Sequence, residues 1–349
     1  MDDKFIINDL EYSSSELSNF AEKKIRSSST PEWEKELYYF IIQWFSPNEY
    51  VSIFTSGSTG TPKEIKLLKT DMIKSANRSN TFFELKQLDN ALLCLSVKYI
   101  AGMMMVVRAF CGKLNLITIP PQQLEEIKKP LVFAAMVPLQ IDKLLAQSNL
   151  LNTIAKIIIG GTPMNDSLTK KLLRVYKGMA WETYGMTETI THVAVKEIKK
   201  NENNNIFNAL PGISFSQDNR NCLVINDKLI QPKLLITNDH IELLSQTSFR
   251  LLGRYDNVIN TGGIKVQPEE LEEKLHPYIK GKFCITSMPD DKLGEIVLLI
   301  IEKEAIKSNL EKGLATISHY QKPKQIIEID KIPLLNNGKI DRIALKKMI

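Results

Sequence analysis

The sequence predicts an α/β protein with a large N-terminal domain and a small α+β domain at its C-terminal end. In the first part, short apolar runs alternate with segments of helical spacing, as expected of a mostly parallel sheet covered by helices. After residue 205, shorter strands are separated by Gly, Asn and Asp turns, and the pattern changes again from residue 267. We therefore expect one domain of residues 1–255 and a second of residues 256–349.

The composition is that of an ordinary globular protein. The chain has 349 residues, of which 43% are hydrophobic and 24% charged, enough to bury a sizeable core in about two domains. Its 45 basic and 40 acidic residues give a net charge of +5. This balance argues against nucleic-acid binding and is compatible with small anionic ligands. The oligomeric state does not follow from the sequence.

Cysteine usage and hydropathy favour a cytoplasmic protein. The cysteines lie in apolar runs without a Cys-x-x-Cys pair, which favours reduced core thiols. The start of the chain lacks a signal-peptide pattern, and the most apolar segment, residues 100–110, is interrupted by Arg108 and is too short to cross a bilayer. We expect no membrane insertion. The cysteines are Cys94, Cys111, Cys222 and Cys284.

Two early helices have start signals. Thr30 is a candidate N-cap and Pro31 a candidate first helical residue, and the apolar side chains of residues 32–45 fall on one stripe. Thr70 is expected to cap a second helix that reaches Phe83. Both segments therefore predict amphipathic helices.

The remaining elements follow from short apolar runs and turn residues. In the first domain, strands are expected at residues 50–54, 64–68, 90–97, 113–119, 131–137 and 155–161. A small antiparallel barrel or sheet is expected from residues 222–226, 233–237, 240–244 and 248–253. In the C-terminal domain, helices are expected at residues 268–275 and 304–313, and strands at 283–288, 295–302 and 324–329.

The segment TSGSTGTPK, residues 55–63, joins the first two of these strands. Its amides, hydroxyl groups and terminal lysine are the groups needed to hold a polyphosphate. It differs from the nucleotide-kinase loop, because Glu64 rather than Ser or Thr follows Lys63 and a strand rather than a helix comes next. A surface turn of small polar residues is the alternative.

The stretch WETYGMTETITH, residues 181–192, combines an aromatic residue, a glycine, hydroxyl groups and a carboxylate. Tyr184 is suited to stack on a base, Thr187 to hydrogen-bond a phosphate and Glu188 to bind Mg²⁺, which prefers oxygen ligands. The alternative is a strand end with Tyr184 in the core.

Two later stretches complete the pattern. Arg254, Asp256 and the pair Gly262-Gly263 lie in residues 251–272, for which an ordinary domain linker is the alternative. Near the C-terminus, KIPLLNNGKIDR contains an Asn-Gly turn signal that places Lys339 at the tip of a turn. A surface lysine is the alternative there.

These four stretches, in this order, resemble the adenylate-forming superfamily, which contains acyl-CoA synthetases, luciferases and nonribosomal-peptide adenylation domains. The resemblance runs from about Val51 to the C-terminus. Within the superfamily the chain is most similar to short o-succinylbenzoate-CoA ligases of menaquinone synthesis, from YIAGMMMVVRAF, ETYGMTETITH and the short chain. It implies ATP, Mg²⁺ and coenzyme A as ligands, a small carboxylic acid as substrate, and a mobile C-terminal domain.

The resemblance also implies roles for individual residues. Thr187 would meet the α-phosphate, Glu188 the magnesium, and Lys339 would serve the adenylation step. Asp256 would be the hinge, and the other roles divide by ligand. Thr55, Ser56, Ser58, Thr59 and Lys63 would bind the pyrophosphate end of ATP, and Gly160, Gly161, Thr162 and Tyr184 would frame adenine. Asp239 and Arg254 would bind the ribose, and the loop with Gly262 and Gly263 would approach coenzyme A.

The acyl pocket is defined less closely. Arg108, a cation in an apolar run, binds either a second carboxyl group of the substrate or a carboxylate of a helix neighbour, and the second interpretation is favoured. Thr191 and His192 are pocket candidates by position. Tyr99 stands where many relatives have a histidine. No His or Cys spacing indicates zinc, and surface or capping roles are expected for His240, His276 and His319.

The chain departs from the superfamily pattern in two further ways. Only 54 residues precede Thr55, so part of the usual first subdomain is expected to be missing or reduced. The usual Thr-Gly-Asp before the ribose is Thr237-Asn238-Asp239 here.

The resemblance implies an ATP-dependent acid–CoA ligase that makes o-succinylbenzoyl-CoA. One alternative is a ligase that adenylates another aryl or acyl acid and delivers it to CoA or a carrier protein. A catalytically decayed nucleotide-binding protein is the alternative of another class. The joint presence of Lys63, Glu188, Arg254 and Lys339 argues against decay.

Overall fold

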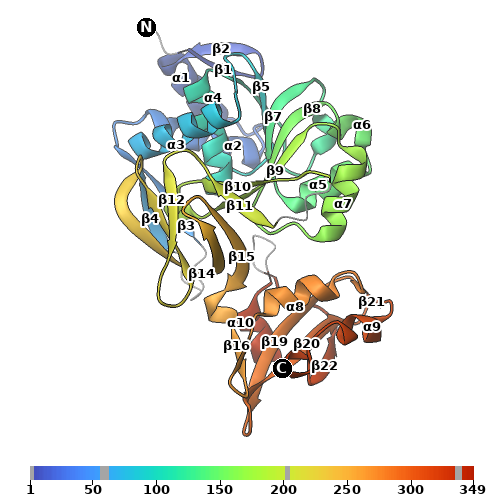
Figure 1. Cartoon of the computed structure of the whole chain (residues 1–349). Coiled ribbons are helices and arrows are strands. Elements are labelled where there is room, and N and C mark those ends of the chain that lie inside the picture. The colour runs from blue at the N-terminus through green and yellow to red at the C-terminus, as the bar shows by residue number, and fades with distance from the viewer. Residues whose placement is uncertain (1–3, 56–62, 201–204, 335–339) are drawn as a thin grey trace. The chain divides into compact units, whose positions relative to one another are not determined.

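The computed structural model describes residues 4–55, 63–200, 205–334 and 340–349 (Figure 1). The chain divides into two compact units. The first comprises Met1–Pro163, Lys171–Ser214 and Asn226–Leu234, and the second comprises Met164–Lys170, Phe215–Ile225 and Leu235–Ile349. The boundary expected near Asp256 falls inside the second unit and stays a prediction.

A parallel sheet forms the centre of the first unit, as the alternation of apolar runs predicts. Its parallel strands lie in the order β9, β8, β7, β5, β6, and β10 pairs with β9 in the antiparallel direction. Figure 1 shows α3 and α4 on one side of this sheet and α5 and α6 on the other. The strands are β5 (Asn90–Leu93), β6 (Asn115–Thr118), β7 (Leu131–Met136), β8 (Ile154–Ile159), β9 (Met179–Gly185), β10 (His192–Glu197) and β11 (Ile206–Ala209).

The helices of this region bury apolar side chains, among them Leu17, Leu37 and Met104. Their bounds are α1 (Ser14–Arg26), α2 (Glu32–Phe45), α3 (Lys69–Phe82), α4 (Ile100–Gly112), α5 (Pro138–Leu145), α6 (Ser148–Leu151) and α7 (Asp166–Val175). In the part of the chain that the structure describes, none of the helices has the length and apolar character needed to cross a membrane.

An N-terminal hairpin that the sequence reading missed extends the sheet. Strand β1 (Lys4–Ile7) pairs with β6 in the parallel direction and with β2 (Leu10–Ser13) in the antiparallel direction. Asn8 and Asp9 connect β1 to β2 with φ of 49° and 68°, the left-handed pair typical of two-residue hairpin turns. The Asn115 amide donates to Asp9 at 2.7 Å, which fixes this turn to the start of β6.

Two helix starts differ by a residue or more from the prediction. Helix α2 begins at Glu32, so Pro31 is the N-cap rather than the first helical residue. Helix α3 begins at Lys69, and Thr70 is therefore not its cap. The reason is that β4 remains extended through Leu68, after which the Lys69 amide donates to the Glu49 carbonyl at 2.9 Å.

The expected strand pair around the soft segment is confirmed. Strands β3 (Tyr50–Thr55) and β4 (Lys63–Leu68) are antiparallel, in a register that pairs Tyr50 with Leu68 and Thr55 with Lys63. The segment between them, residues 56–62, lies outside the described residues.

In the second unit, the antiparallel character expected after residue 205 is confirmed by the pairing of β14 with β15. The strands are β12 (Ile213–Gln217), β13 (Cys222–Asp227), β14 (Gln231–Ser245) and β15 (Ser248–Arg254), of which residues 213–214, 226–227 and 231–234 belong to the first unit. The prediction of two strands at residues 233–244 was wrong, because β14 is continuous. Thr237 donates to the Leu223 carbonyl and accepts from the Asp239 amide, which keeps the backbone extended through Asn238.

The C-terminal residues form a sheet whose two faces carry separate cores. Its strands lie in the order β17, β16, β20, β19, and β22 pairs with β20 in the parallel direction. The elements are β16 (Ile259–Thr261), β17 (Ile264–Val266), α8 (Pro268–Leu275), β18 (Ile279–Lys280), β19 (Phe283–Asp290), β20 (Gly294–Glu302), β21 (Ile306–Lys307), α9 (Leu310–Ala315), β22 (Gln325–Ile329) and α10 (Arg342–Met348).

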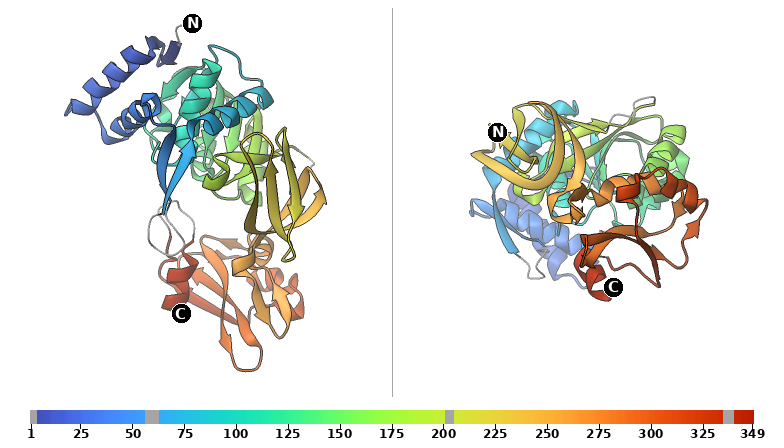
Figure 2. Two further views of the ribbon diagram at one scale, coloured as in Figure 1. Left: turned by 90° about the vertical axis from the view of Figure 1, so that its left-hand side faces the viewer. Right: turned by 60° about the horizontal axis from the view of Figure 1, so that its bottom comes forward.

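Residue alternation explains the two cores. Phe283 and Ile285 of β19 pack with the α8 residues Leu271 and Leu275 on one face. Cys284, between them in sequence, packs on the other face with residues that include Leu345 of α10. Figure 2 shows this sheet in orange and red, with α10 against it near the C-terminus.

One helix of this region is shorter than predicted. The pattern of residues 304–313 predicts a helix, but α9 starts only at Leu310. The preceding Ile306 and Lys307 form β21, which pairs with β18, and Asn309 has a left-handed φ of 58°. Strand pairing therefore overrides the helical spacing there.

A buried ion pair fixes α3 to the end of β13 in the first unit. The Arg78 guanidinium donates to both oxygens of Asp227 at 2.7 and 2.6 Å. The two side chains are only 4% and 12% exposed. Asp227 also accepts from the Leu229 amide at 3.0 Å, so one carboxylate holds the helix and a turn.

We predict that Asp227→Asn lowers the free energy of unfolding by about 3 to 5 kcal/mol, because it leaves the charge of Arg78 buried without a partner. Urea denaturation measures this change. The matched control is Asp142→Asn, which breaks the exposed pair of Lys171 with Asp142 and is expected to change it by less than about 1 kcal/mol. Equal losses in both variants would contradict the prediction.

Candidate active site

Two of the predicted motifs meet at the carboxyl end of adjacent parallel strands. Gly160 comes directly after β8. Tyr184 lies in β9, which pairs with β8, and Thr187 comes shortly after the end of β9. The Thr183 hydroxyl donates to the Ile159 carbonyl at 3.2 Å. Ligands of open α/β sheets bind beyond the carboxyl ends of the strands, so this edge is the candidate binding site.

Gly160 is required for this close approach. A Cβ atom at Gly160 would lie 2.5 Å from the Thr183 hydroxyl oxygen. The next residue, Gly161, has a φ of 89°, which a side chain disfavours. Thr162 follows and is half-buried. The loop after β8 therefore presents backbone groups rather than side chains at the sheet edge.

Tyr184 lies near the end of β9 and is 8% exposed. Its ring packs against that of Phe207 at a centroid distance of 5.9 Å. The burial agrees with the core position that was the alternative for this residue, and its predicted contact with adenine stays a prediction.

The turn after Thr187 and Glu188 is strained. Ile190 has a φ of 65°, and the Thr191 amide donates to the Thr189 carbonyl at 2.7 Å across it, which defines a tight three-residue turn. A β-branched residue with positive φ is a conformational outlier. The Thr189 hydroxyl supports the turn by donating within it, to the Met186 or the Thr191 carbonyl.

This turn separates an exposed carboxylate from a buried polar cluster. Glu188 is exposed, and among the described residues it has no ion-pair partner. A free carboxylate of this kind suits Mg²⁺, which takes few protein ligands and completes its shell with phosphate oxygens and water. The described residues contain no group of three or more His, Cys, Asp or Glu that would hold a metal by itself.

Arg108 lies at the centre of the buried cluster. It projects from α4 and is 2% exposed. One guanidinium nitrogen donates to the Thr191 hydroxyl at 2.6 Å and lies 3.4 Å from His192 Nδ1. His192 Nε2 lies 3.3 Å from the hydroxyl of Ser79 on α3. The cluster therefore joins α3, α4 and β10.

The direction of these hydrogen bonds follows from the guanidinium, which only donates. The Thr191 oxygen accepts from Arg108, so its own hydrogen is available for His192 Nδ1, 3.1 Å away. This assigns the remaining ring proton to Nε2, facing Ser79. Burial and the charges of Arg108 and Arg78 lower the pKa of His192 well below 6.5, so the ring is neutral.

The favoured interpretation of Arg108 as a structural ion pair has no counterpart in the described residues, where no carboxylate lies within ion-pair distance of its guanidinium. Burial lowers the pKa of Arg108 to about 10, which leaves it cationic at neutral pH. Its Nε also lacks a hydrogen-bond partner among the described atoms. Arg108 is thus a buried cation with polar but uncharged neighbours.

Several predicted ATP residues lie outside the described part. These are Ser56, Ser58, Thr59 and Lys339, and the side chains of Thr55 and Lys63 also lie outside it. Tyr99 is described: it is the N-cap of α4 without a side-chain capping bond, and it is 51% exposed.

In the second unit, the two residues that the resemblance assigns to the ribose form an ion pair with each other. Asp239 and Arg254 face each other across β14 and β15, and their charged atoms are 3.2 Å apart. Arg254 also pairs with Asp256 at 3.1 Å. The Asn238 amide donates to Asp256 at 3.2 Å. The departure from the usual glycine thus places a hydrogen-bond donor beside the predicted hinge.

The double glycine forms the turn of a β-hairpin. Gly262 and Gly263 connect β16 to β17 with φ of 59° and 80°. A Cβ atom at Gly263 would meet nothing within 4 Å, so this glycine is set by its backbone conformation rather than by crowding in the described structure.

The sequence reading missed Ser79 and Asn80. Asn80 donates to the carbonyl oxygen of Arg108 at 2.9 Å, and Ser79 contacts His192. The signal was present, because both residues occupy the stripe that Met72, Ala76 and Phe83 define on α3. Polar residues at apolar positions of a buried stripe indicate polar partners.

Comparison with known proteins agrees with this architecture. The family model described as AMP-binding enzyme matches residues 4–215. The structure is similar to that of an acyl-CoA synthetase (AMP-forming)/AMP-acid ligase II-like protein from Dyadobacter fermentans, with 30% identity, a TM-score of 0.61 and coverage of 95% of this chain and 98% of that one. The chain therefore belongs to the AMP-binding enzyme family, within the adenylate-forming acid–CoA ligases.

Two matches at lower sequence identity are named as ligases of o-succinylbenzoate and coenzyme A. A 2-succinylbenzoate–CoA ligase of Lactococcus lactis is 23% identical over 329 residues, which cover 86% of this chain and 72% of the relative. The structure of O-succinylbenzoate Coenzyme A Synthetase from Bacillus subtilis, in complex with ATP and magnesium ion, gives a TM-score of 0.72 at 18% identity over 84% of this chain and 69% of that one. At 18% identity, the similarity to this structure shows that the two chains share a fold.

We predict that His192 makes stability depend on pH. Its folded pKa is depressed below 6.5, so only the unfolded state gains a proton as pH falls below that value. Stability is therefore retained above pH 6.5 and declines below it by up to about 1.4 kcal/mol per pH unit.

Urea denaturation between pH 5 and pH 8 tests this. His192→Gln should flatten the decline, whereas the control His319→Gln, at an exposed histidine, should leave it unchanged. A wild-type slope that persists in His192→Gln would assign the effect to other groups.

Proposed function

We propose that the protein adenylates o-succinylbenzoate with ATP and transfers the acyl group to coenzyme A, giving o-succinylbenzoyl-CoA for menaquinone biosynthesis. Membership of the AMP-binding enzyme family supports the reaction class. Relatives named 2-succinylbenzoate–CoA ligase, at 23% and 25% identity, support the substrate.

The observation that carries the substrate proposal is the buried charge of Arg108. A cation taken out of water costs several kcal/mol unless an anion or good hydrogen bonds compensate. Its neighbours Thr191 and His192 are neutral, so they solvate the charge without neutralising it. An acid that carries a second carboxylate besides the reacting one supplies the missing anion, and o-succinylbenzoate is such an acid.

Residues of several motifs are assigned to ATP. The loop with Thr55, Ser56, Ser58, Thr59 and Lys63 binds the pyrophosphate, while Gly160, Gly161, Thr162 and Tyr184 frame adenine, and Asp239 and Arg254 bind the ribose. Glu188 holds Mg²⁺, which supplies positive charge at the phosphates. These assignments rest on the motif resemblance and on the placement of the loop after β8 beside β9.

In the first half-reaction, a carboxylate oxygen of the acid attacks the α-phosphorus and the bond to pyrophosphate breaks. Negative charge accumulates on the phosphoryl oxygens in the transition state. Thr187 donates a hydrogen bond to the α-phosphate, and Lys339 places an ammonium group there. Removal of one aimed donor of this kind costs about 10²-fold to 10³-fold in rate.

In the second half-reaction, the thiol of coenzyme A attacks the acyl carbonyl and AMP leaves. Lys339 occupies the same neighbourhood during the first step, so the C-terminal domain must turn between the steps. We assign the hinge to Asp256, which pairs with Arg254 and accepts from Asn238. This rotation brings the β16–β17 turn to the thiol of coenzyme A, where Gly262 and Gly263 allow the backbone to approach closely.

A ligase for another acid, delivering it to CoA or to a carrier protein, is the second candidate. It is favoured by a 22% match to a linear gramicidin synthase of Brevibacillus parabrevis and a 34% match over 120 residues to a 2,3-dihydroxybenzoate-AMP ligase of Vibrio cholerae. Pyrophosphate release and thioester formation, measured with a panel of aryl and acyl acids, separate the candidates. Product from another acid but none from o-succinylbenzoate would refute the proposed substrate.

We predict that Arg108→Met raises the KM for o-succinylbenzoate by about 10²-fold or more, because a hydrogen-bonded charge pair is lost. Adenylation of benzoate, which lacks the second carboxylate, should be slow in both proteins and unchanged by the substitution. This acid is the internal control for folding. An equal effect on both acids would remove Arg108 from substrate recognition.

We predict that Lys339→Ala lowers adenylation by about 10²-fold to 10³-fold through loss of the cation at the α-phosphate. Thioester formation from supplied acyl-adenylate and CoA should stay within about threefold of wild type, because this step proceeds with the lysine withdrawn. The two half-reactions are measured separately. Equal losses in both would count against the moving domain.

A further inference from the structure

The two ends of the segment 335–339 are tied to each other by described residues. Leu334 and Ile340 form an antiparallel bridge. The Asp341 amide donates to the Pro333 carbonyl at 2.9 Å. Leu334 and Ile340 therefore lie side by side, directly before α10.

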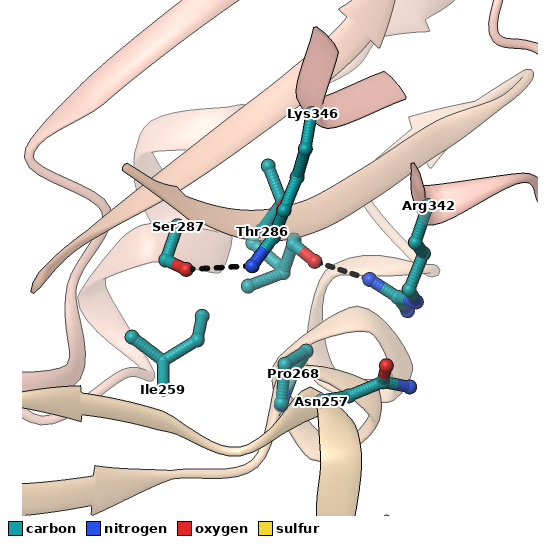
Figure 3. A pocket seen from close by; sticks show the side chains of 8 residues that line it. Asn257, Ile259, Pro268, Thr286, Ser287, Arg342 and Lys346 are labelled. Atoms are coloured by element: carbon teal, nitrogen blue, oxygen red, sulfur yellow. Dashed lines mark hydrogen bonds between the residues drawn. The ribbon is translucent and has the colours of Figure 1, made fainter. Parts of the chain in front are cut away.

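Arg342, the first residue of α10, anchors that place to β19. One guanidinium nitrogen donates to both oxygens of Glu272 on α8, at 2.8 and 3.0 Å, and the other donates to the Ile285 carbonyl. Glu272 accepts from the Ile285 amide at 2.7 Å. The ion pair thus engages both polar backbone groups of one residue in the central part of β19. Figure 3 shows Arg342 beside this strand.

The anchor is partly buried and continues into the core. The side chains of Arg342 and Glu272 are 20% and 21% exposed. Ile332, before the segment, and Leu345, after it, are both 0% exposed and belong to one hydrophobic cluster. Burial raises the pKa of Glu272, and the charge of Arg342 opposes that shift. The chain is therefore fixed on both sides of the segment.

The cavity beside the anchor is too small to explain these groups as a ligand site. It has a volume of about 20 Å³ and is lined in part by Thr286, Ser287, Arg342 and Lys346 (Figure 3). A space of this size holds about one water molecule. Lys346 donates to Ser287 at 3.2 Å, so its ammonium is also engaged within the domain.

We infer that Arg342 and Glu272 are positioning residues: by fixing the described backbone directly after segment 335–339, they determine where Lys339 can reach during adenylation. This inference rests on the proposed function, which gives Lys339 its role. Arg342 follows Lys339 by only three residues, so the anchor lies a short length of chain from the lysine. A displacement of about 1 Å in a reacting geometry costs about 10²-fold in rate.

The two half-reactions distinguish positioning from general stability. In the proposed mechanism, thioester formation uses Gly262 and Gly263 of the same domain but not Lys339. A displaced lysine lowers only adenylation. Unfolding of the domain lowers both reactions.

The test uses the full chain with Glu272→Gln and, as a second variant, Arg342→Lys, which keeps the charge but loses the two-pronged contact. The matched control is Asp330→Asn, which breaks the exposed pair with Lys303 in the same domain. Pyrophosphate release is measured with ATP and o-succinylbenzoate. Thioester formation is measured from supplied o-succinylbenzoyl-adenylate and CoA.

We expect both anchor variants to lose about 10-fold to 100-fold in adenylation while thioester formation stays within about threefold of wild type. Asp330→Asn should leave both unchanged. Adenylation within about twofold of wild type in the anchor variants, or an equal fall in both half-reactions, would overturn the inference. If one variant does not fold, the other decides.

Hydrogen exchange of the amides of residues 340–345 gives a readout that needs no substrate. We expect faster exchange in Glu272→Gln than in wild type and in Asp330→Asn, and unchanged exchange overturns the anchor itself. Failure of the proposed function is seen separately, as absence of acyl-adenylate in the wild type. In that case the positioning role falls with it, and faster exchange shows a structural ion pair only.

Discussion

The burial of one guanidinium group, that of Arg108, constrains the centre of the first unit. A cation inside an apolar helix needs donors and acceptors arranged around it, because water is excluded there. The Thr191 hydroxyl accepts a hydrogen bond from it, and the neighbouring His192 is kept neutral. The Ser79 hydroxyl lies at the Nε2 side of the imidazole. The tight turn at Ile190 brings Thr191 into this arrangement at a conformational cost. Packing of α3, α4 and β10 is thereby coupled to a polar cluster rather than to apolar contacts alone.

Ion pairs in this structure differ in what they do, and burial decides the difference. Arg78 uses two nitrogens for Asp227, and Arg342 uses one for Glu272 and one for the Ile285 carbonyl. Both pairs are shielded and tied to backbone groups, so each fixes the position of elements distant in sequence. Exposed pairs such as Lys303 with Asp330 contribute little, because water and salt screen them. Removing one partner of a buried pair leaves an uncompensated charge, whereas removing an exposed partner does not.

Sequence patterns predicted the fold well wherever the local and the global preferences agree. The parallel strands β5 to β8 are continuous apolar runs, and α8 begins with a proline as expected. Errors occurred where pairing with a distant segment decides the outcome. Residues 304–313 have helical spacing, yet Ile306 pairs with β18. The hairpin of β1 and β2 was missed because its partner, β6, lies about a hundred residues further along the chain.

The sequence by itself determined which residue types are available to bind phosphate, magnesium and a carboxylic acid. Motifs such as TSGSTGTPK and NGKIDR are local, so their spacing can be recognised without a structure. Only the tertiary structure decided that Gly160 abuts Thr183 and that Ser79, Thr191 and His192 surround Arg108. It also decided that no carboxylate pairs with Arg108 among the described residues. The physical reason is that the cost of a buried charge depends on every group within a few ångströms, and those groups come from helices and strands far apart in the chain.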